Sequence, residues 1–258
     1  MAAVHSTALV EPGARLADDV EIGPYSIIGS AVRIGAGSRI GPHAVIVGRT
    51  TLGERNRVFQ FASVGDIPQD RKYGGEPTTT TIGDDNVIRE YVSIHAGTAQ
   101  DRGDTTIGSG NLFLAYAHVA HGCVVGNATT FSNNAQIAGH VTIGDYAVLG
   151  AYAGVHQFCR IGAHAFVGMG CLVNGDVPPF VMIAADYGRP RGINAEGLKR
   201  RGFDADRIAA IKRAYRALYL GNRSQAEARA ELAVIAADSK DVAVMLDFIE
   251  ASGRPLVR

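Results

Sequence analysis

An aliphatic side chain recurs every six residues along most of this chain, and this period restricts the fold more than any other feature. The positions run from Val4 to Val64, resume from Ile82 to Ile94, and run again from Ile107 to Val173. An α-helix repeats every 3.6 residues and a strand every two, so neither alone places a six-residue repeat on one face. A chain that forms a short strand, turns a corner and starts again after six residues fits the pattern.

Small side chains occupy the fourth position after many of these residues, as an interior with room for one large group per strand requires. Three six-residue sides make a triangular coil, and coils stack at the strand spacing of about 4.8 Å. We therefore expect a parallel β-helix over residues 1–190, a solenoid with one continuous core. It resembles the hexapeptide-repeat class, whose coils wind left-handed against the usual crossover preference. The small residues include Ser26, Ser38, Ala44, Ala62, Ala117, Cys123, Thr129, Ala135, Ala147, Ala153, Cys159, Ala165 and Cys171.

Two polar segments interrupt the period and predict loops that leave the solenoid. One spans residues 66–81, with the sequence DIPQDRKYGGEPTTTT, and the other spans residues 99–106. Long excursions from a regular solenoid usually serve function or assembly.

The last third of the chain changes its pattern. We expect the repeat to end at Val173, because prolines 178 and 179 cannot serve a central sheet ladder. Helical spacing follows from Ile208 to Tyr219 behind a possible cap at Asp204. A second helix is expected from Ser224 to about residue 237, where Ser224 and Glu227 match a capping box, and a third over residues 241–251. The predicted fold class is an all-β left-handed parallel β-helix (residues 1–190) with a C-terminal α-helical domain (191–258).

Composition narrows the functional class. Lys plus Arg and Asp plus Glu both number 25, which argues against a nucleic-acid partner, since such proteins are usually markedly basic. The sequence contains no run of about 18 apolar residues, so no transmembrane segment is expected, and the N-terminus does not resemble a secretory signal. The three cysteines form no CxxC pattern and favour a reduced, cytoplasmic setting. Their interior positions predict a structural role rather than nucleophilic catalysis.

Histidines are the candidate reactive side chains. The coil period places His121, Gly139, His140 and His156 along one corner of the solenoid, with His118 close by. An imidazole with a pKa near 6.5 can take a proton from a hydroxyl that attacks a carbonyl. The backbone N–H of Gly139, one coil above His121, could donate to the developing oxyanion because no side chain blocks the approach.

Two other functions fit the same features. Three histidines on a hexapeptide solenoid would suit a zinc site of the γ-class carbonic anhydrase kind, which shares the fold. A solenoid can also be a binding scaffold without catalytic activity.

Several segments together resemble the UDP-N-acetylglucosamine 3-O-acyltransferase family of lipid A synthesis. They are HVAHGCVVG, SNNAQIAGHVTIGDYAVLG, VHQFCRIGAHAFVG, QDRKYGGEPT, SIHAGT and INAEGLKRRGF, and the match spans nearly the whole chain. The resemblance implies transfer of an (R)-3-hydroxyacyl group from acyl carrier protein to the 3-hydroxyl of UDP-GlcNAc, the first step of lipid A synthesis. It also implies a cytoplasmic homotrimer with sites between subunits, and no cofactor beyond the phosphopantetheine that carries the acyl donor.

The resemblance assigns roles to individual residues. It makes His121 the general base and the Gly139 amide the oxyanion donor. The residues that match substrate contacts are Asp70, Lys72, His95, His118, His140, His156, Gln157, Asn194, Glu196, Arg200 and Arg201. The last four match the nucleotide region, although the two arginines could instead form a solvated basic patch or a docking surface for the acidic carrier protein. Asp70 and Lys72 could equally be polar loop surface.

Two positions bear on mechanism and specificity. In the family an Asp that orients the imidazole commonly follows the catalytic His, whereas Gly122 stands here, so that a backbone carbonyl, a water or another side chain would have to orient His121. We expect Gly122→Asp not to lower activity. Met169 matches the residue that closes the acyl channel in the family, and a bulky methionine there predicts a short acyl chain of about ten to twelve carbons. The other interpretation is that Met169 packs against a neighbouring subunit.

Some alternatives remain open at this stage. The sibling N-acyltransferases of lipid A synthesis use the same donor, but they normally carry an extra N-terminal domain, whereas this repeat begins at Val4. The exact length and hydroxylation of the acyl chain, and a 3-amino sugar in place of UDP-GlcNAc, are not decided by the sequence.

Overall fold

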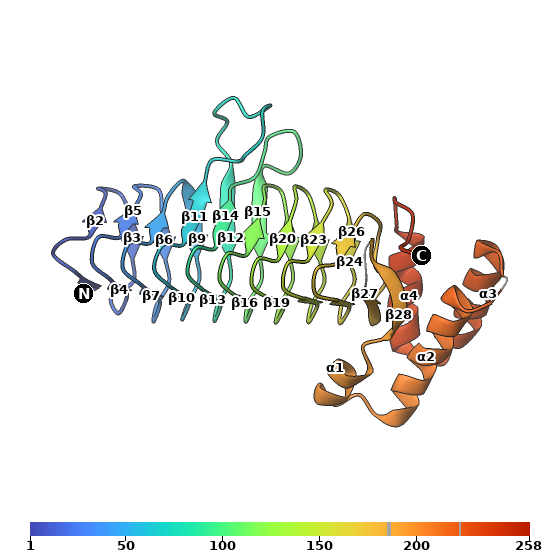
Figure 1. Cartoon of the computed structure of the whole chain (residues 1–258). Helices are drawn as coiled ribbons and strands as arrows, with labels where there is room; N and C mark the ends of the chain where they lie inside the picture. Colours follow the sequence, from blue (N-terminus) through green and yellow to red (C-terminus); the bar gives the residue numbers. More distant parts are fainter. Residues whose placement is uncertain (185–186, 222) are drawn as a thin grey trace.

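Short strands at the same position of successive coils pair in parallel and form three sheets around a common axis (Figure 1). The computed structural model describes residues 1–184, 187–221 and 223–258. Val119 pairs with Ile137 and Ile137 with Val155, which confirms the predicted coil. Beyond the last coil, the described residues form four helices at the far end of the prism from the N-terminus (Figure 1).

The strands of each sheet follow one another along the prism. The first sheet contains β1 (Ala3–Val4), β4 (Glu21–Ile22), β7 (Arg39–Ile40), β10 (Arg57–Val58), β13 (Val87–Ile88), β16 (Leu112–Phe113), β19 (Thr130–Phe131), β22 (Val148–Leu149), β25 (Phe166–Val167), β27 (Val181–Ala184) and β28 (Arg189–Ile193). The second contains β2 (Leu9–Val10), β5 (Ile27–Ile28), β8 (Val45–Ile46), β11 (Ser63–Asp66), β14 (Ser93–His95), β17 (His118–Val119), β20 (Gln136–Ile137), β23 (Gly154–Val155) and β26 (Leu172–Val173). The third contains β3 (Arg15–Leu16), β6 (Arg33–Ile34), β9 (Arg49–Leu52), β12 (Thr79–Ile82), β15 (Asp104–Ile107), β18 (Val124–Val125), β21 (Thr142–Ile143) and β24 (Arg160–Ile161).

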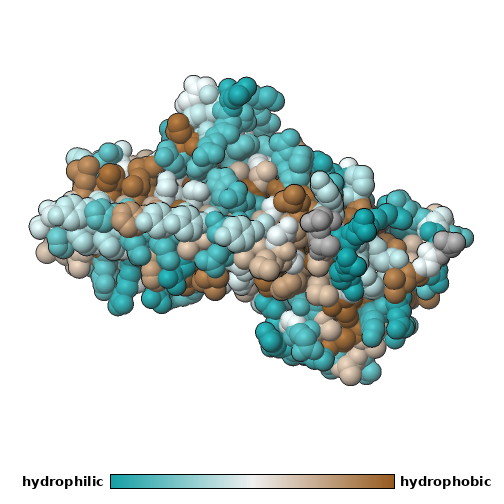
Figure 2. Space-filling view, in the orientation of Figure 1, coloured by the Kyte–Doolittle hydropathy of each residue, from teal (hydrophilic) through white to brown (hydrophobic). Residues whose placement is uncertain are grey.

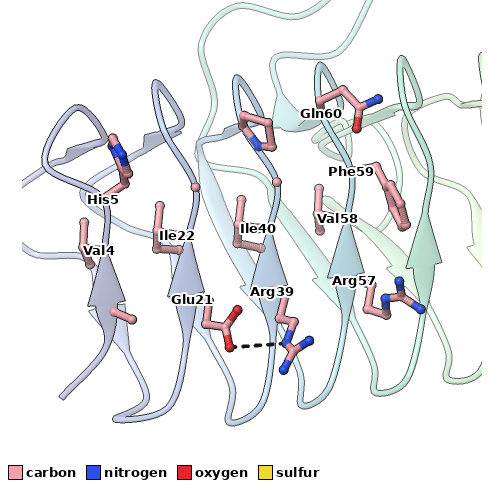
Figure 3. A pocket seen from close by; sticks show the side chains of 14 residues that line it. Val4, His5, Glu21, Ile22, Arg39, Ile40, Arg57, Val58, Phe59 and Gln60 are labelled. Carbon is pink, nitrogen blue, oxygen red and sulfur yellow. Dashed lines mark ion pairs between the residues drawn. The ribbon is translucent and has the colours of Figure 1, made fainter.

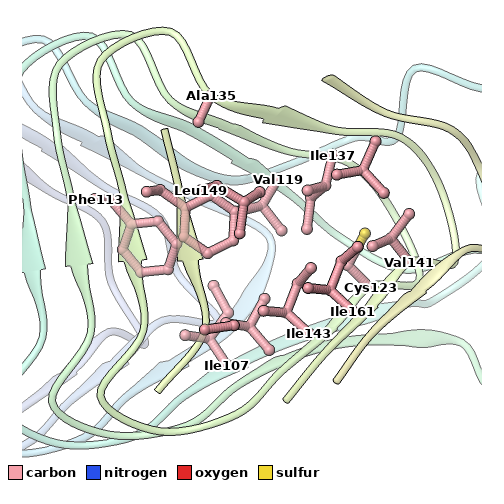
Figure 4. Close-up of a cluster of buried hydrophobic side chains, with 14 of the residues drawn as sticks. Ile107, Phe113, Val119, Cys123, Ala135, Ile137, Val141, Ile143, Leu149 and Ile161 are labelled. Carbon is pink, nitrogen blue, oxygen red and sulfur yellow. The ribbon is translucent and has the colours of Figure 1, made fainter. Parts of the chain in front are cut away.

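The interior alternates large and small side chains, as the sequence predicts (Figure 4). The rings of Phe113 and Phe131 contact each other from one coil to the next, tilted by 38° with centroids 4.8 Å apart, and the small side chains Ala117 and Ala135 are fully buried. All three cysteines are buried. Burial raises the pKa of the Cys123 thiol to about 12, which fits a packing residue rather than a nucleophile.

Corners of the coil impose a left-handed backbone conformation on one residue per turn. Gly122, His140 and Phe158 occupy one corner in three successive coils, with φ values of 68°, 62° and 64°. At this corner His140 donates its N–H to the carbonyl of His121 at 3.0 Å, and Phe158 donates to the carbonyl of Gly139 at 3.1 Å. These hydrogen bonds hold the residues of one corner in line, which positions the histidines.

Two excursions leave the same edge of the prism (Figure 1). The first covers residues 67–78 between β11 and β12, and the second covers residues 96–103 between β14 and β15. The first is shorter than predicted, and the second begins and ends three residues earlier than predicted, because residues 79–81 and 104–106 already pair as strands. Figure 2 shows that the excursions are mostly hydrophilic.

The solenoid continues past the predicted end at Val173. Val177 bridges to Ile161, and β27 pairs in parallel with β25, so the prolines at 178 and 179 form a corner between strands rather than a stop. β28 then turns back antiparallel to β27. The proposed division at residue 190 falls inside β28.

The helical end contains α1 (Ala195–Arg200), α2 (Ala205–Tyr219), α3 (Gln225–Ala236) and α4 (Lys240–Glu250). The sequence predicts the last three, and the caps at Asp204 and Ser224 are confirmed, with the capping box to Glu227 present. The helix α1 is not anticipated, because six residues carry too little periodicity. No helix in the described part of the chain is long and apolar enough to cross a membrane.

Candidate active site

The imidazole of His121 lies against the bare Cα of Gly139, one coil further on. A Cβ added to Gly139 would be 2.5 Å from Cε1 and 2.8 Å from Nε2 of His121, so only glycine leaves room for the ring. Among the described residues, the N–H of Gly139 donates no backbone hydrogen bond, whereas its carbonyl accepts from Phe158 at 3.1 Å. A base and a free backbone donor therefore lie side by side.

Burial sets the protonation of His121. The pKa of this imidazole falls below its ordinary 6.5, mainly because burial disfavours the charged form and also because His140 is close, while the carboxylate of Asp70 raises it. Its Nδ1 is buried and has no hydrogen-bond partner among the described residues. The ring is thus neutral at neutral pH and is held by packing.

His118 lies three residues before His121, in β17, and has a different environment. Its Nδ1 is 2.7 Å from Oγ of Ser93, and its ring meets that of His95 edge to face at 5.1 Å. Burial and the two neighbouring histidines lower the pKa of His118 to about 4. His118 is therefore neutral and polar at neutral pH.

His140 occupies the corner beside His121, and its ring contacts the ring of His121 edge to face at a centroid distance of 4.9 Å. Asp101, from the second excursion, places Oδ2 2.9 Å from Nδ1 of His140. A Cβ on Gly122 would be 2.5 Å from that same Nδ1. The structure argues against the expectation that Gly122→Asp is harmless, because the new side chain would displace His140.

One cleft of about 640 Å³ brings several predicted residues together. His118, His121, Gly139, His156 and Gln157 line it. Its wall also includes residues that the sequence did not single out: Gln69, Ala120, Gln136, Ile137, Ala138, Gly154, Val155, Leu172, Val173, Asn174 and Tyr187. His95 and His140 stand behind this lining and contact His118 and His121, respectively.

The first excursion approaches the cleft from the side. Asp70 is close enough to His121 to influence its pKa, and its carboxylate also accepts from the backbone N–H of Lys72 at 3.0 Å. The Lys72 side chain is exposed and does not line the cleft of this chain.

The four residues predicted for the nucleotide lie around α1, outside this cleft. Asn194 caps α1 and donates from Nδ2 to the carbonyl of His164 at 3.0 Å. Glu196 pairs with Lys199 at 2.8 Å, and the guanidinium of Arg201 lies 4.9 Å from the ring centre of Tyr146. Arg200 is an exposed side chain of the same helix. A single chain does not bring these groups to His121.

Met169 does not line the cleft either. It sits next to the corner residue Gly170 and is 78% exposed. Within one chain, Leu172, Asn174 and Tyr187 are among the residues that line the cleft.

A second hollow of about 630 Å³ lies over the first sheet near the N-terminus (Figure 3). Its side chains are mainly aliphatic or arginine, and Glu21 pairs with Arg39 at 3.4 Å. It contains none of the residues predicted for the site. In residues 1–184, 187–221 and 223–258, no group of three His, Cys, Asp or Glu side chains is arranged to hold a metal ion.

Sequence reasoning missed Ser93 and Asp101. Ser93 could have been found, because it pairs in register with His118 once the second loop is allowed for. Asp101 lies in a loop without periodicity, so no pattern in the sequence points to its contact with His140.

Comparisons with known proteins agree with the geometry. The family described as "Udp N-acetylglucosamine O-acyltransferase; Domain 2" matches residues 176–257, and "Bacterial transferase hexapeptide (six repeats)" matches residues 140–175. A protein of Stenotrophomonas maltophilia named as an acyl-carrier-protein-dependent UDP-N-acetylglucosamine O-acyltransferase is 58% identical over 99% of this chain and 97% of its own length. A protein of the same name from Thiobacillus denitrificans is 55% identical over the whole of both chains.

Solved structures show the same architecture. LpxA from Acinetobacter baumannii has a TM-score of 0.96 and 42% identity, covering 99% of both chains. The UDP-N-acetylglucosamine acyltransferase of Francisella novicida has a TM-score of 0.97 and 41% identity, covering 99% of this chain and 94% of its own. These likenesses establish the left-handed hexapeptide β-helix with short C-terminal helices. On these full-length matches, the chain belongs to the UDP-N-acetylglucosamine O-acyltransferase family.

Proposed function

We propose that this protein transfers an (R)-3-hydroxyacyl group from acyl carrier protein to the 3-hydroxyl of UDP-GlcNAc, the first step of lipid A synthesis. The names of the full-length relatives support this donor and acceptor. The observation that carries the mechanism is the neutral imidazole of His121 packed on Gly139. The relatives' names do not favour a carbonic anhydrase or an N-acyltransferase.

The reaction follows from this pair. Nε2 of His121 removes the proton of the sugar hydroxyl as its oxygen attacks the thioester carbonyl carbon. The carbonyl electrons move to the oxygen, and the free N–H of Gly139 stabilises that charge. When the carbonyl re-forms, the carbon–sulfur bond breaks, and the phosphopantetheine thiolate takes the proton from His121. The acyl donor brings its own prosthetic group, so the proposed reaction uses no further cofactor.

The proposed working unit is a homotrimer in the cytoplasm. The α1 residues and Met169 lie outside the cleft of one chain, so a neighbouring copy would have to bring such groups to His121. In that arrangement, Asp70, Lys72, His118, His156, Gln157 and the α1 residues bind the substrates, and Met169 limits the acyl channel.

An acyl-transfer assay with UDP-GlcNAc and carrier proteins loaded with 3-hydroxyacyl chains of several lengths tests the proposal. We expect His121→Ala to lower kcat by at least about a hundredfold. His43→Asn is the matched control, because His43 is an exposed corner residue with φ of 55° and Asn134 adopts the same conformation elsewhere. Full activity of His121→Ala would contradict the mechanism.

The same assay tests the acyl specificity. Wild-type protein is expected to prefer chains of about ten to twelve carbons, and Met169→Gly to shift the preference to longer donors, because a flexible bulky side chain is removed. An unchanged preference would show that Met169 does not limit the channel.

A further inference from the structure

We propose that Asp101 is a positioning residue: its carboxylate fixes the imidazole of His140 and, through that ring, the imidazole of His121. This inference rests on the proposed function, since it names a further residue of the same site. The contact itself joins a loop to the solenoid and is independent of the substrate.

Stacking defines the plane of the His140 ring. The ring lies parallel to that of Phe158, with centroids 4.7 Å apart and 6° between the planes. Gly122, at the same corner one coil earlier, leaves space at the Nδ1 edge of His140. Stacking alone does not determine which way the ring is turned within that plane, because a flipped ring stacks equally well.

The carboxylate of Asp101 removes this ambiguity. Its Oδ2 is 2.9 Å from Nδ1 of His140, and an ionised carboxylate only accepts hydrogen bonds. Nδ1 of His140 must therefore carry a proton in this contact. The His140 side chain is only 12% exposed, whereas the Asp101 side chain is 41% exposed, so the histidine end of this hydrogen bond is shielded from solvent and the carboxylate end is partly solvated.

His121 depends on this arrangement. Its own Nδ1 has no partner among the described residues, so its orientation comes from the groups that it touches. These include the Cα of Gly139 and the ring of His140, which meets it edge to face. A His140 ring that turned or shifted would change the packing of the proposed base.

The loop that carries Asp101 is itself anchored. The neighbouring Gln100 donates from Nε2 to the carbonyl of Lys72 at 3.3 Å, which links the second excursion to the first. Asp101 also donates its backbone N–H to Thr98 at 3.3 Å. The carboxylate is therefore delivered by a loop with contacts on both sides rather than by a free segment.

A double-mutant cycle on the full-length protein tests the proposal. Asp101→Ala should lower kcat about tenfold with little change in the KM for UDP-GlcNAc, because a misplaced base slows chemistry more than binding. Asp101→Asn should lower kcat less than Asp101→Ala does, since the carbonyl oxygen of the asparagine still accepts a hydrogen bond from Nδ1 of His140. In a His140→Ala background, Asp101→Ala should not lower kcat further, because the effects of substituting two residues that act through one contact are not additive. Asp104→Asn is the control, since Asp104 directly follows the same loop as the first residue of β15 and pairs with Arg102 instead.

The histidine tautomer provides a readout that does not need activity. In ¹⁵N-histidine spectra of the intact protein, assigned with His140→Ala, we expect His140 to carry its proton on Nδ1 and to lose this preference in Asp101→Ala. A wild-type His140 protonated on Nε2 alone would overturn the proposal, as would additive losses in the cycle. Absence of transfer by a wild-type protein with the expected tautomer would instead refute the proposed function alone.

Discussion

Gly139 illustrates how much depends on one missing methyl group. The site for its Cβ lies 2.5 Å from a carbon of the His121 ring, closer than real Cβ contacts come. Gly139→Ala should therefore push the imidazole away and lower kcat on the order of a hundredfold, because small displacements of a base are costly. Gly253→Ala is a suitable control, since a Cβ there meets nothing within 4 Å. Equal kcat values for both variants would show that the ring adjusts without loss.

The pKa of His121 makes a second prediction at the level of the residue. Burial, His140 and His95 lower it, so the midpoint for protonation of the base lies below pH 6.5. The acid limb of kcat/KM should accordingly lie below pH 6.5. Asp70→Asn removes the carboxylate that raises this pKa, so the limb should move further towards acid. A limb that moves towards alkaline pH in Asp70→Asn would contradict this assignment.

Periodic elements were predictable because their physics is local. The six-residue period predicts each strand and corner, and the capping box of Ser224 and Glu227 predicts the start of α3. The bounds of the excursions were less certain, because residues 79–81 and 104–106 are polar threonine-rich segments that nevertheless pair as strands. The continuation through β27 was missed because prolines usually end a ladder, whereas here they fall at a corner.

In the candidate site too, residues on the periodic coils could be predicted from the sequence, whereas a residue on a loop could not. The coil period alone places Gly139 beside His121, since both lie on regular turns. Asp101 could not be placed, because the path of its loop depends on contacts with Lys72 and His140 that are distant in sequence. Its position also provides a candidate for the orienting group that Gly122 cannot supply.

At the scale of the whole molecule, His164 lies at the junction between the prism and its helical end. This side chain stacks between Tyr146 and Phe180, and the ring of Phe203 meets it edge to face, so it links the last coils to the segment between α1 and α2. Burial, with a smaller effect of Arg201, lowers the pKa of His164 to about 4. The junction is therefore built around an imidazole that is neutral in the folded state.

That junction predicts a loss of stability in mild acid. As the pH falls from 6.5 towards 4, the unfolded chain binds a proton on His164 that the folded chain does not, so the free energy of unfolding decreases. His164→Phe should reduce this decrease, because it keeps the stack without a titrating group, and phenylalanine already occupies corners of positive φ at Phe61 and Phe158. Urea unfolding at pH 7 and pH 5, at one protein concentration, measures the difference. His118, with a pKa of about 4, remains in the variant, so part of the loss should persist. If wild type and variant lose the same amount, the acid sensitivity does not originate at the junction.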